Sequence, residues 1–191
     1  MQLICIQPAQ REPISVAEAK QFLRIDHDSE DDLLQHLIQM ARCVIENYTQ
    51  RSLLTQTWRL TAALQPSFRS YLLSKKMHPG KWTLDLPRAP FVKLAKDPLL
   101  VGCSSTLGYQ FAPHYDRGRL LLNSEEIAGQ TLQVDFIVGY GDDSANIPPA
   151  LRQAVLEMVA QFYQHRGETR KGTGHEAVYN LLQPYVWMAL Q

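Results

Sequence analysis

Hydrophobic positions follow a helical period near both ends of the chain and an alternating period in the middle. Before residue 50, apolar side chains recur every three or four residues over about four turns, which predicts a helix with one apolar face. A second stripe of this kind follows residue 147. The stripes consist of Leu33, Leu34, Leu37, Ile38, Ala41, Val44, Ile45 and Tyr48, and of Leu151, Ala154, Val155, Met158, Val159, Phe162 and Tyr163. We expect these two stripes to pack against each other as the main core.

Local signals place the ends of the helices. Ser15 is followed three residues later by Glu18, which is the spacing of a capping box and predicts a short first helix. The acidic residues of 26–32 fall at the first turn of the next helix, where the helix dipole favours negative charge. We therefore expect N-terminal helices within 13–50, and a main C-terminal helix over 147–166 whose first turn accommodates two prolines.

The middle of the chain, from 55 to 140, carries the pattern of short strands. Thr55–Thr61, Trp82–Leu86 and Leu132–Val138 alternate between apolar and polar residues and are rich in β-branched and aromatic types. Prolines and glycines separate these runs, and 67–80 follows no period. The expected fold class is α+β: mainly a helical bundle, in which the N-terminal helices pack with a long C-terminal helix, with a central antiparallel β-rich insertion over 55–140. We expect residues 1–191 to form a single domain.

The composition is that of an ordinary globular protein. Hydrophobic residues make up 45% and charged residues 20%, and the formal net charge is zero, which argues against a dedicated nucleic-acid binder. The chain has no run of about eighteen apolar residues, so we expect no membrane-spanning helix. Cys5, Cys43 and Cys103 lie too far apart for a zinc motif or a disulfide framework and are typical of a reducing cytoplasm.

Motifs for catalysis or metal binding are incomplete wherever they begin. His175 and Glu176 start like a zinc-protease motif, but Tyr179 occupies the position of the second histidine. The glycines of 172–174 follow a helix and not a strand, unlike those of a phosphate-binding loop. The acidic run 26–32 lacks the ligand spacing of a calcium loop. We therefore expect no catalytic residues, no metal and no cofactor.

The C-terminal segment 169–191 has the composition of a contact surface. Its basic residues either meet DNA phosphates or stay solvated. Its aromatic residues are of the types favoured at interface cores; the alternative is that they fold back onto the core of the chain itself. We expect a glycine-containing hinge followed by a docking segment. The predicted partner contacts are Arg170, Lys171, Tyr179, Leu182, Tyr185 and Trp187.

Short motifs in collinear order give the chain a family resemblance. They are Pro13–Lys20, Leu23–Asp26, Asp31–Leu33, Ala41, Ile45–Thr49, Arg51, Leu54–Trp58, Leu86–Pro90, Phe136–Gly141, Ile147–Ala154 and Leu181–Tyr185. In this arrangement the chain resembles the head–tail connector (adaptor) proteins of long-tailed phages, prophages and gene transfer agents. It departs from the family at Val186, where an arginine is common, and over 67–80.

The resemblance implies a structural subunit and not an enzyme. Connector subunits form a ring, commonly of about twelve copies, beneath the portal and extend the DNA channel toward the tail. The implied partners are the portal protein, a tail-completion or stopper protein, other copies of the chain, and DNA that passes without sequence-specific contact. The implied location is the head–tail junction of the virion, with assembly in the host cytoplasm.

We expect the isolated subunit to be monomeric or weakly associated and to close into a ring on the portal. Two other functions stay open from the sequence. A nucleic-acid-binding DNA-packaging factor would need a clustered basic face. A small phage enzyme would need a pocket with converging titratable groups.

Overall fold

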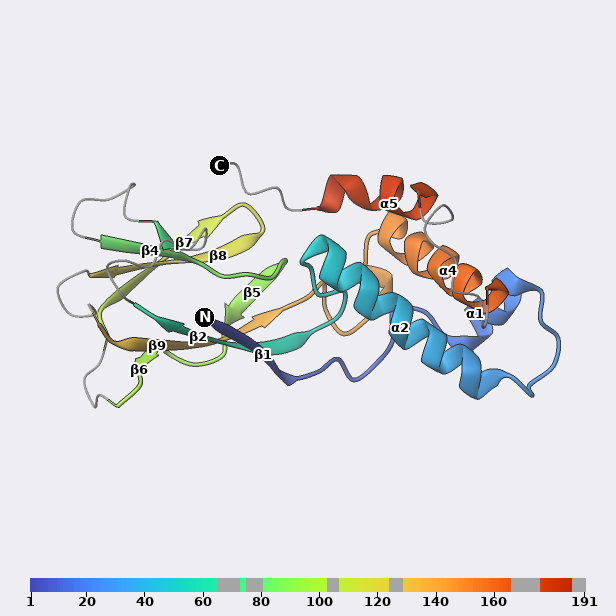
Figure 1. The fold of residues 1–191 in the computed structure, drawn as a ribbon, viewed down its shortest axis with the longest axis horizontal. Coiled ribbons are helices and arrows are strands. Elements are labelled where there is room, and N and C mark those ends of the chain that lie inside the picture. The colour runs from blue at the N-terminus through green and yellow to red at the C-terminus, as the bar shows by residue number, and fades with distance from the viewer. Residues whose placement is uncertain (65–72, 75–80, 103–106, 124–128, 166–175, 187–191) are drawn as a thin grey trace. The chain divides into compact units, whose positions relative to one another are not determined.

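The computed structural model describes residues 1–64, 73–74, 81–102, 107–123, 129–165 and 176–186 (Figure 1). The Cα positions divide these residues into two compact units. The β unit contains residues 1–8 and 55–139. The helical unit contains residues 9–54 and 140–186.

Four α-helices build the helical unit within the described residues. They are α1 (Val16–Leu23), α2 (Asp31–Thr49), α4 (Pro149–Gln164) and α5 (Glu176–Leu182), with single 3-10 turns η1 (Ser144–Asn146) and η2 (Gln183–Tyr185). The apolar stripes of α2 and α4 meet in one core, which confirms the predicted pairing. Its fully buried members include Ile38, Ala41, Ile45, Leu151, Ala154 and Val155.

The predicted capping box at the start of α1 is present. The Ser15 hydroxyl accepts a hydrogen bond from the Glu18 amide at 3.2 Å, and the Ser15 amide donates to the Glu18 carboxylate at 2.8 Å. The hydrogen bond from the Ser15 amide is the main reason that the pKa of Glu18 is lowered. At the other end of α1, Lys20 pairs with Asp31 at 2.9 Å, in the acidic first turn of α2. The local capping signal therefore determines the start of α1, and acidic residues occupy the first turn of α2 as predicted.

Two antiparallel sheets form the β unit. The first sheet has the order β1–β2–β9–β5, and β6 also pairs with β9. Its strands are β1 (Gln2–Gln7), β2 (Gln56–Ala63), β5 (Phe91–Leu94), β6 (Leu99–Leu100) and β9 (Thr131–Val138). The second sheet has the order β3–β4–β8–β7. Its strands are β3 (Leu73–Ser74), β4 (Lys81–Asp85), β7 (Tyr109–His114) and β8 (Arg117–Asn123).

Strand β9 shows how alternation divides the first sheet into an inner and an outer face. Leu132, Val134, Phe136 and Val138 are fully buried, whereas Gln133 and Ile137 on the other face are partly exposed. Asp135 belongs to the outer face, yet it is only 5% exposed. The cause is a bidentate ion pair, in which Arg59 of the neighbouring β2 donates to both carboxylate oxygens at 2.7 and 2.8 Å.

A glycine allows the two sheets to approach each other closely. A Cβ atom on Gly118 of β8 would lie 2.7 Å from the Phe91 ring of β5 and 2.8 Å from the Leu86 side chain. Around this contact, the Leu86 amide donates to the Gly118 carbonyl at 2.8 Å, and the Phe91 amide donates to the Asp116 carbonyl at 2.7 Å. Position 118 therefore has room for hydrogen alone, because a larger side chain would push β5 away from β8.

The predicted fold class, mainly a helical bundle with a β-rich insertion, is wrong. In addition to the four α-helices, the described residues contain nine strands in two antiparallel sheets. The β unit is also more than an insertion, because its edge strand β1 precedes the first helix. The sequence interpretation missed β1 because a short apolar run has no period that identifies it as a strand. The prediction of one domain over residues 1–191 stays a prediction.

Candidate assembly surface

The last helix of the described chain, α5, packs against the core formed by α2 and α4. Val178 and Leu182 are both fully buried in the core formed by α2 and α4. Leu182 was a predicted partner contact, but its buried side chain has no surface to offer a partner in this structure. The sequence alternative, that residues of this segment fold onto the core of the chain itself, therefore describes Leu182.

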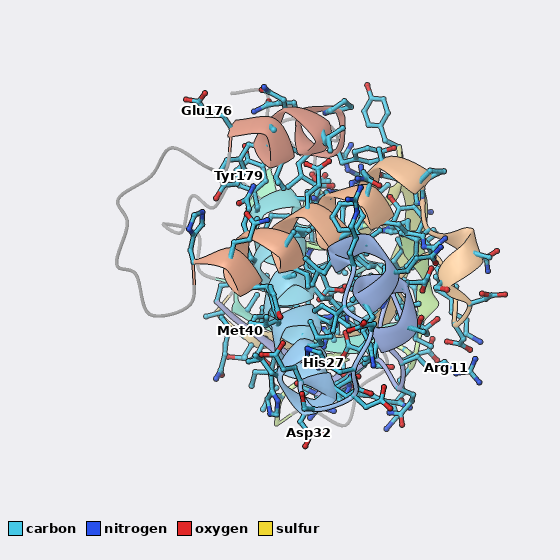
Figure 2. The ribbon with its side chains drawn as sticks, turned by 90° about the vertical axis from the view of Figure 1, so that its right-hand side faces the viewer. Arg11, His27, Asp32, Met40, Glu176 and Tyr179 are labelled. Atoms are coloured by element: carbon cyan, nitrogen blue, oxygen red, sulfur yellow. The ribbon has the colours of Figure 1, made fainter. Side chains whose placement is uncertain are left out.

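The tyrosines of this segment are partly exposed. Tyr179, on α5, is labelled in Figure 2. Its ring packs against Tyr48 of α2, with ring centroids 4.6 Å apart and ring planes tilted by 45°. The side-chain amide of Gln183 donates to the Tyr48 hydroxyl at 3.2 Å. Met40, two turns before Tyr48 on α2, is 52% exposed. Aromatic rings that are fixed by a neighbour and still reach the surface are suited to partner contact.

Arg51, just beyond α2, holds the closing turn η2 in place. Its Nε donates to the Tyr185 carbonyl at 2.8 Å, and its Nη1 donates to the Tyr140 hydroxyl at 3.1 Å. The guanidinium carbon lies 5.8 Å from the centroid of the Tyr185 ring, at the outer limit of a cation–π contact. Sequence reasoning did not single out Arg51 as a site residue, although it belongs to the motif that suggested the family.

An ion-pair network fixes the segments that enter and leave the helical unit. Arg42 of α2 pairs with Glu12 at 2.7 Å and with Glu46 at 3.3 Å. Glu46 is 5% exposed, and its carboxylate accepts a hydrogen bond from the Leu53 backbone amide at 2.8 Å. Burial acts to lower the pKa of Arg42, but the hydrogen bond to Glu12 and the charge of Glu46 outweigh it and raise that pKa. Arg42 is therefore charged at any physiological pH, and its ion pairs act as a structural tie.

A second group of exposed apolar side chains lies along the edges of the first sheet. Ile4 and Ile6 of β1 are 44% and 43% exposed. At the opposite edge, Val92, Leu99 and Val101 are 53%, 43% and 51% exposed. Sequence reasoning missed both edges. The available signal was the uncharged run Gln2–Gln7, which contains two isoleucines. Which strands lie at the edges follows only from the pairing.

Several predicted features lie outside the described residues. They are Arg170, Lys171 and Trp187, together with the glycines of 172–174. In the part of the chain that the structure describes, no group of three or more His, Cys, Asp or Glu side chains could hold a metal ion. Among the described helices, none is both long and apolar enough to cross a membrane.

Comparison with known proteins gives two kinds of match. Residues 13–75 match the family described as phage gp6-like head–tail connector protein, which confirms the predicted resemblance. The fold resembles a chain from the neck of an empty gene transfer agent particle computed with C6 symmetry. That match has a TM-score of 0.75 at 22% identity and covers 98% of this chain and 96% of the other.

Two further solved structures show the same fold. A chain in the virion of a native gene transfer agent particle matches with a TM-score of 0.71. A chain in the neck of a native particle computed with C12 symmetry matches with a TM-score of 0.70. Both matches have 22% identity and cover 98% of this chain and 96% of the other. Among curated proteins, no sequence matches the chain.

Proposed function

We propose that this chain is a structural head–tail connector subunit, which assembles as a ring on the portal and extends the DNA channel to the tail. The observation that carries the proposal is the agreement of two comparisons. The connector family matches residues 13–75, and the fold of a gene transfer agent neck chain matches 98% of the chain. The necks were computed with C6 and C12 symmetry, which supports a closed ring.

The physical features of the chain suit this role. A ring subunit needs lateral and axial contact surfaces and no reaction centre. The zero net charge also suits a conduit, because DNA would pass it without strong electrostatic attachment. Neither the family match nor the fold match supports a DNA-packaging factor or a small enzyme.

We assign the contact with the portal to the C-terminal segment. Tyr179 and Tyr185 supply partly exposed aromatic rings, and Arg51 fixes the position of the second ring. Arg170, Lys171 and Trp187 of the same segment complete the proposed contact set. Aromatic and arginine residues dominate the binding energy of many interfaces, which supports this assignment.

Assembly is tested by measuring particle mass and by electron microscopy on the purified full chain, alone and with its portal protein. We expect a monomer or weak oligomer alone and a closed ring on the portal. A stable closed dimer under both conditions would contradict the proposed function. Virions that still join heads to tails after deletion of the gene would contradict it independently.

The portal contact is tested with Tyr185→Ala, with Asn180→Ala as the matched control on the exposed side of α5. Loss of an aromatic anchor costs about 2 kcal/mol or more, so the Kd for the portal should rise roughly thirtyfold. The control should bind like the unmodified chain. If Tyr185→Ala binds the portal as tightly as the control, Tyr185 is not part of the proposed contact.

A further inference from the structure

We propose that neighbouring subunits of the ring join edge to edge through the first sheet, with β1 of one copy pairing with the β5–β6 edge of the next. This inference rests on the proposed function, because it names the contact that would close the ring. It assigns a second copy of the chain as the partner of a surface that sequence analysis did not find.

Strand β1 has the properties of an edge that is covered in an assembly. It ends the strand order of the first sheet, and among the described strands it pairs with β2 alone. Natural edge strands are usually protected by charged residues, proline or bulges. The run Gln2–Gln7 has no charge and no proline, and its register shift falls only between Cys5 and Gln7. With Ile4 and Ile6 exposed, such an edge is prone to pair with another chain.

The opposite edge complements β1 in its side chains. β5 and β6 both pair with β9, and the exposed residues on or beside them include Val92, Leu99 and Val101. Lys93 and Lys96 are also exposed here. Two copies of this edge would bring their lysines together, which disfavours pairing between like edges. The uncharged β1 edge brings no such repulsion and offers Ile4 and Ile6 to the valines and leucine.

The direction of the strands permits a continuous sheet around a ring. The path β1–β2–β9–β5 has an even number of strands, and each is antiparallel to its neighbour. β1 and β5 therefore run in opposite directions. A second copy in the same orientation would place its β5 antiparallel to β1. The Phe91 amide at the start of β5 already donates to the Asp116 carbonyl, so the hydrogen-bond ladder would continue along β5 after Phe91 and along β6. This contact is head-to-tail and can close a ring, whereas β1 paired with β1 would stop at a dimer.

The test places a charge on each edge of the first sheet, in two separate variants of the full-length chain. Ile4→Lys places a charge on β1, and Val92→Lys places one on the opposite edge. Each variant should lose ring formation on the portal, with at least about tenfold weaker association between subunits, because pairing would desolvate the new charge. Tyr115→Lys, in the turn between β7 and β8, is the matched control, since Tyr115 is 92% exposed, and it should assemble normally. All three variants should melt like the unmodified chain.

Mixing the two edge variants gives the sharper result. The Ile4→Lys copy keeps an intact β5–β6 edge, and the Val92→Lys copy keeps an intact β1. At high concentration without portal, an equal mixture should therefore form a one-to-one heterodimer and nothing larger, while each variant alone stays monomeric. Analytical ultracentrifugation measures these species.

The outcomes separate this contact from the proposed function. If the unmodified chain forms no ring with the portal, the proposed function fails, and the heterodimer still decides the edge contact. Loss of assembly by Ile4→Lys but not by Val92→Lys would overturn the head-to-tail pairing. Normal assembly by both edge variants, or an equal loss by the Tyr115→Lys control, would overturn the inference.

Discussion

Substitution of Leu182 distinguishes the two roles that the sequence left open for the C-terminal segment. In a docking arm, this side chain would contribute to partner binding and little to the stability of the free subunit. In the structure it is fully buried with Val178 against the helical core. Leu182→Ala should therefore destabilise the isolated subunit before any partner is present.

The expected size follows from the burial. Leucine to alanine removes three carbon groups, which at about 0.8 kcal/mol each amounts to roughly 2.4 kcal/mol of transfer free energy. A cavity adds to this cost, and substitutions of this kind span about 2 to 5 kcal/mol. Because α5 has only 7 residues, it can shift to fill part of the space. We therefore expect a loss of about 3 kcal/mol, a large part of the roughly 5–15 kcal/mol that stabilises a typical domain.

Urea unfolding followed by far-UV circular dichroism measures this loss, since the signal is dominated by the helices. With a slope of about 2 kcal/mol per molar urea, the midpoint should fall by roughly 1.5 M at an unchanged slope. Asn180→Ala on the exposed side of the same helix should stay within about 0.5 kcal/mol of the unmodified chain. A Leu182→Ala protein that is equally stable but fails to bind the portal would refute the core role and support a docking arm.

Three further predictions test the local structure. Ser15→Ala removes the helix cap and should cost about 1 kcal/mol in thermal unfolding, while Ser15→Thr should retain most of the stability. Gly118→Ala should cost about 1–3 kcal/mol by overpacking against Phe91, and adding Phe91→Leu should recover part of it. The hydrogen bonds from Arg59 lower the pKa of Asp135, so this carboxylate stabilises the fold above its unfolded pKa of about 3.9 and ceases to do so as the pH falls through its folded pKa. Asp135→Asn should reduce the loss of stability that urea midpoints show between neutral pH and about pH 3.

The helical unit was predictable because its signals are local. The cap formed by Ser15 and Glu18 lies within four consecutive residues, and each apolar stripe lies within one helix. An amphipathic helix shows its buried face through the period of its own sequence. The pairing of α2 with α4 then follows, because two apolar stripes of similar length can cover each other.

The β unit was less predictable because strand pairing joins distant residues. Leu132–Val138 carries a clear alternation, and it does form β9. β1 of the same sheet lies more than a hundred residues earlier in the chain, and the ion pair of Asp135 with Arg59 joins residues 76 positions apart. No local pattern shows that a strand is at an edge or that an outward-facing carboxylate is buried. The extent of the sheets, and hence the fold class, depended on these contacts.

In the C-terminal segment, composition alone could not separate residues that contact a partner from residues that pack in the core. Tyr179, Leu182 and Tyr185 are all types that favour interfaces, but the same types favour cores. Helical spacing separates them: Val178 and Leu182 lie one turn apart on the buried side of α5, whereas Tyr179 is only partly buried. Arg51, which binds the carbonyl of Tyr185, then connects this segment to the end of α2. A portal contact through Tyr179 and Tyr185 would thus act on a segment already anchored by Leu182, so binding there would need little ordering of α5 itself.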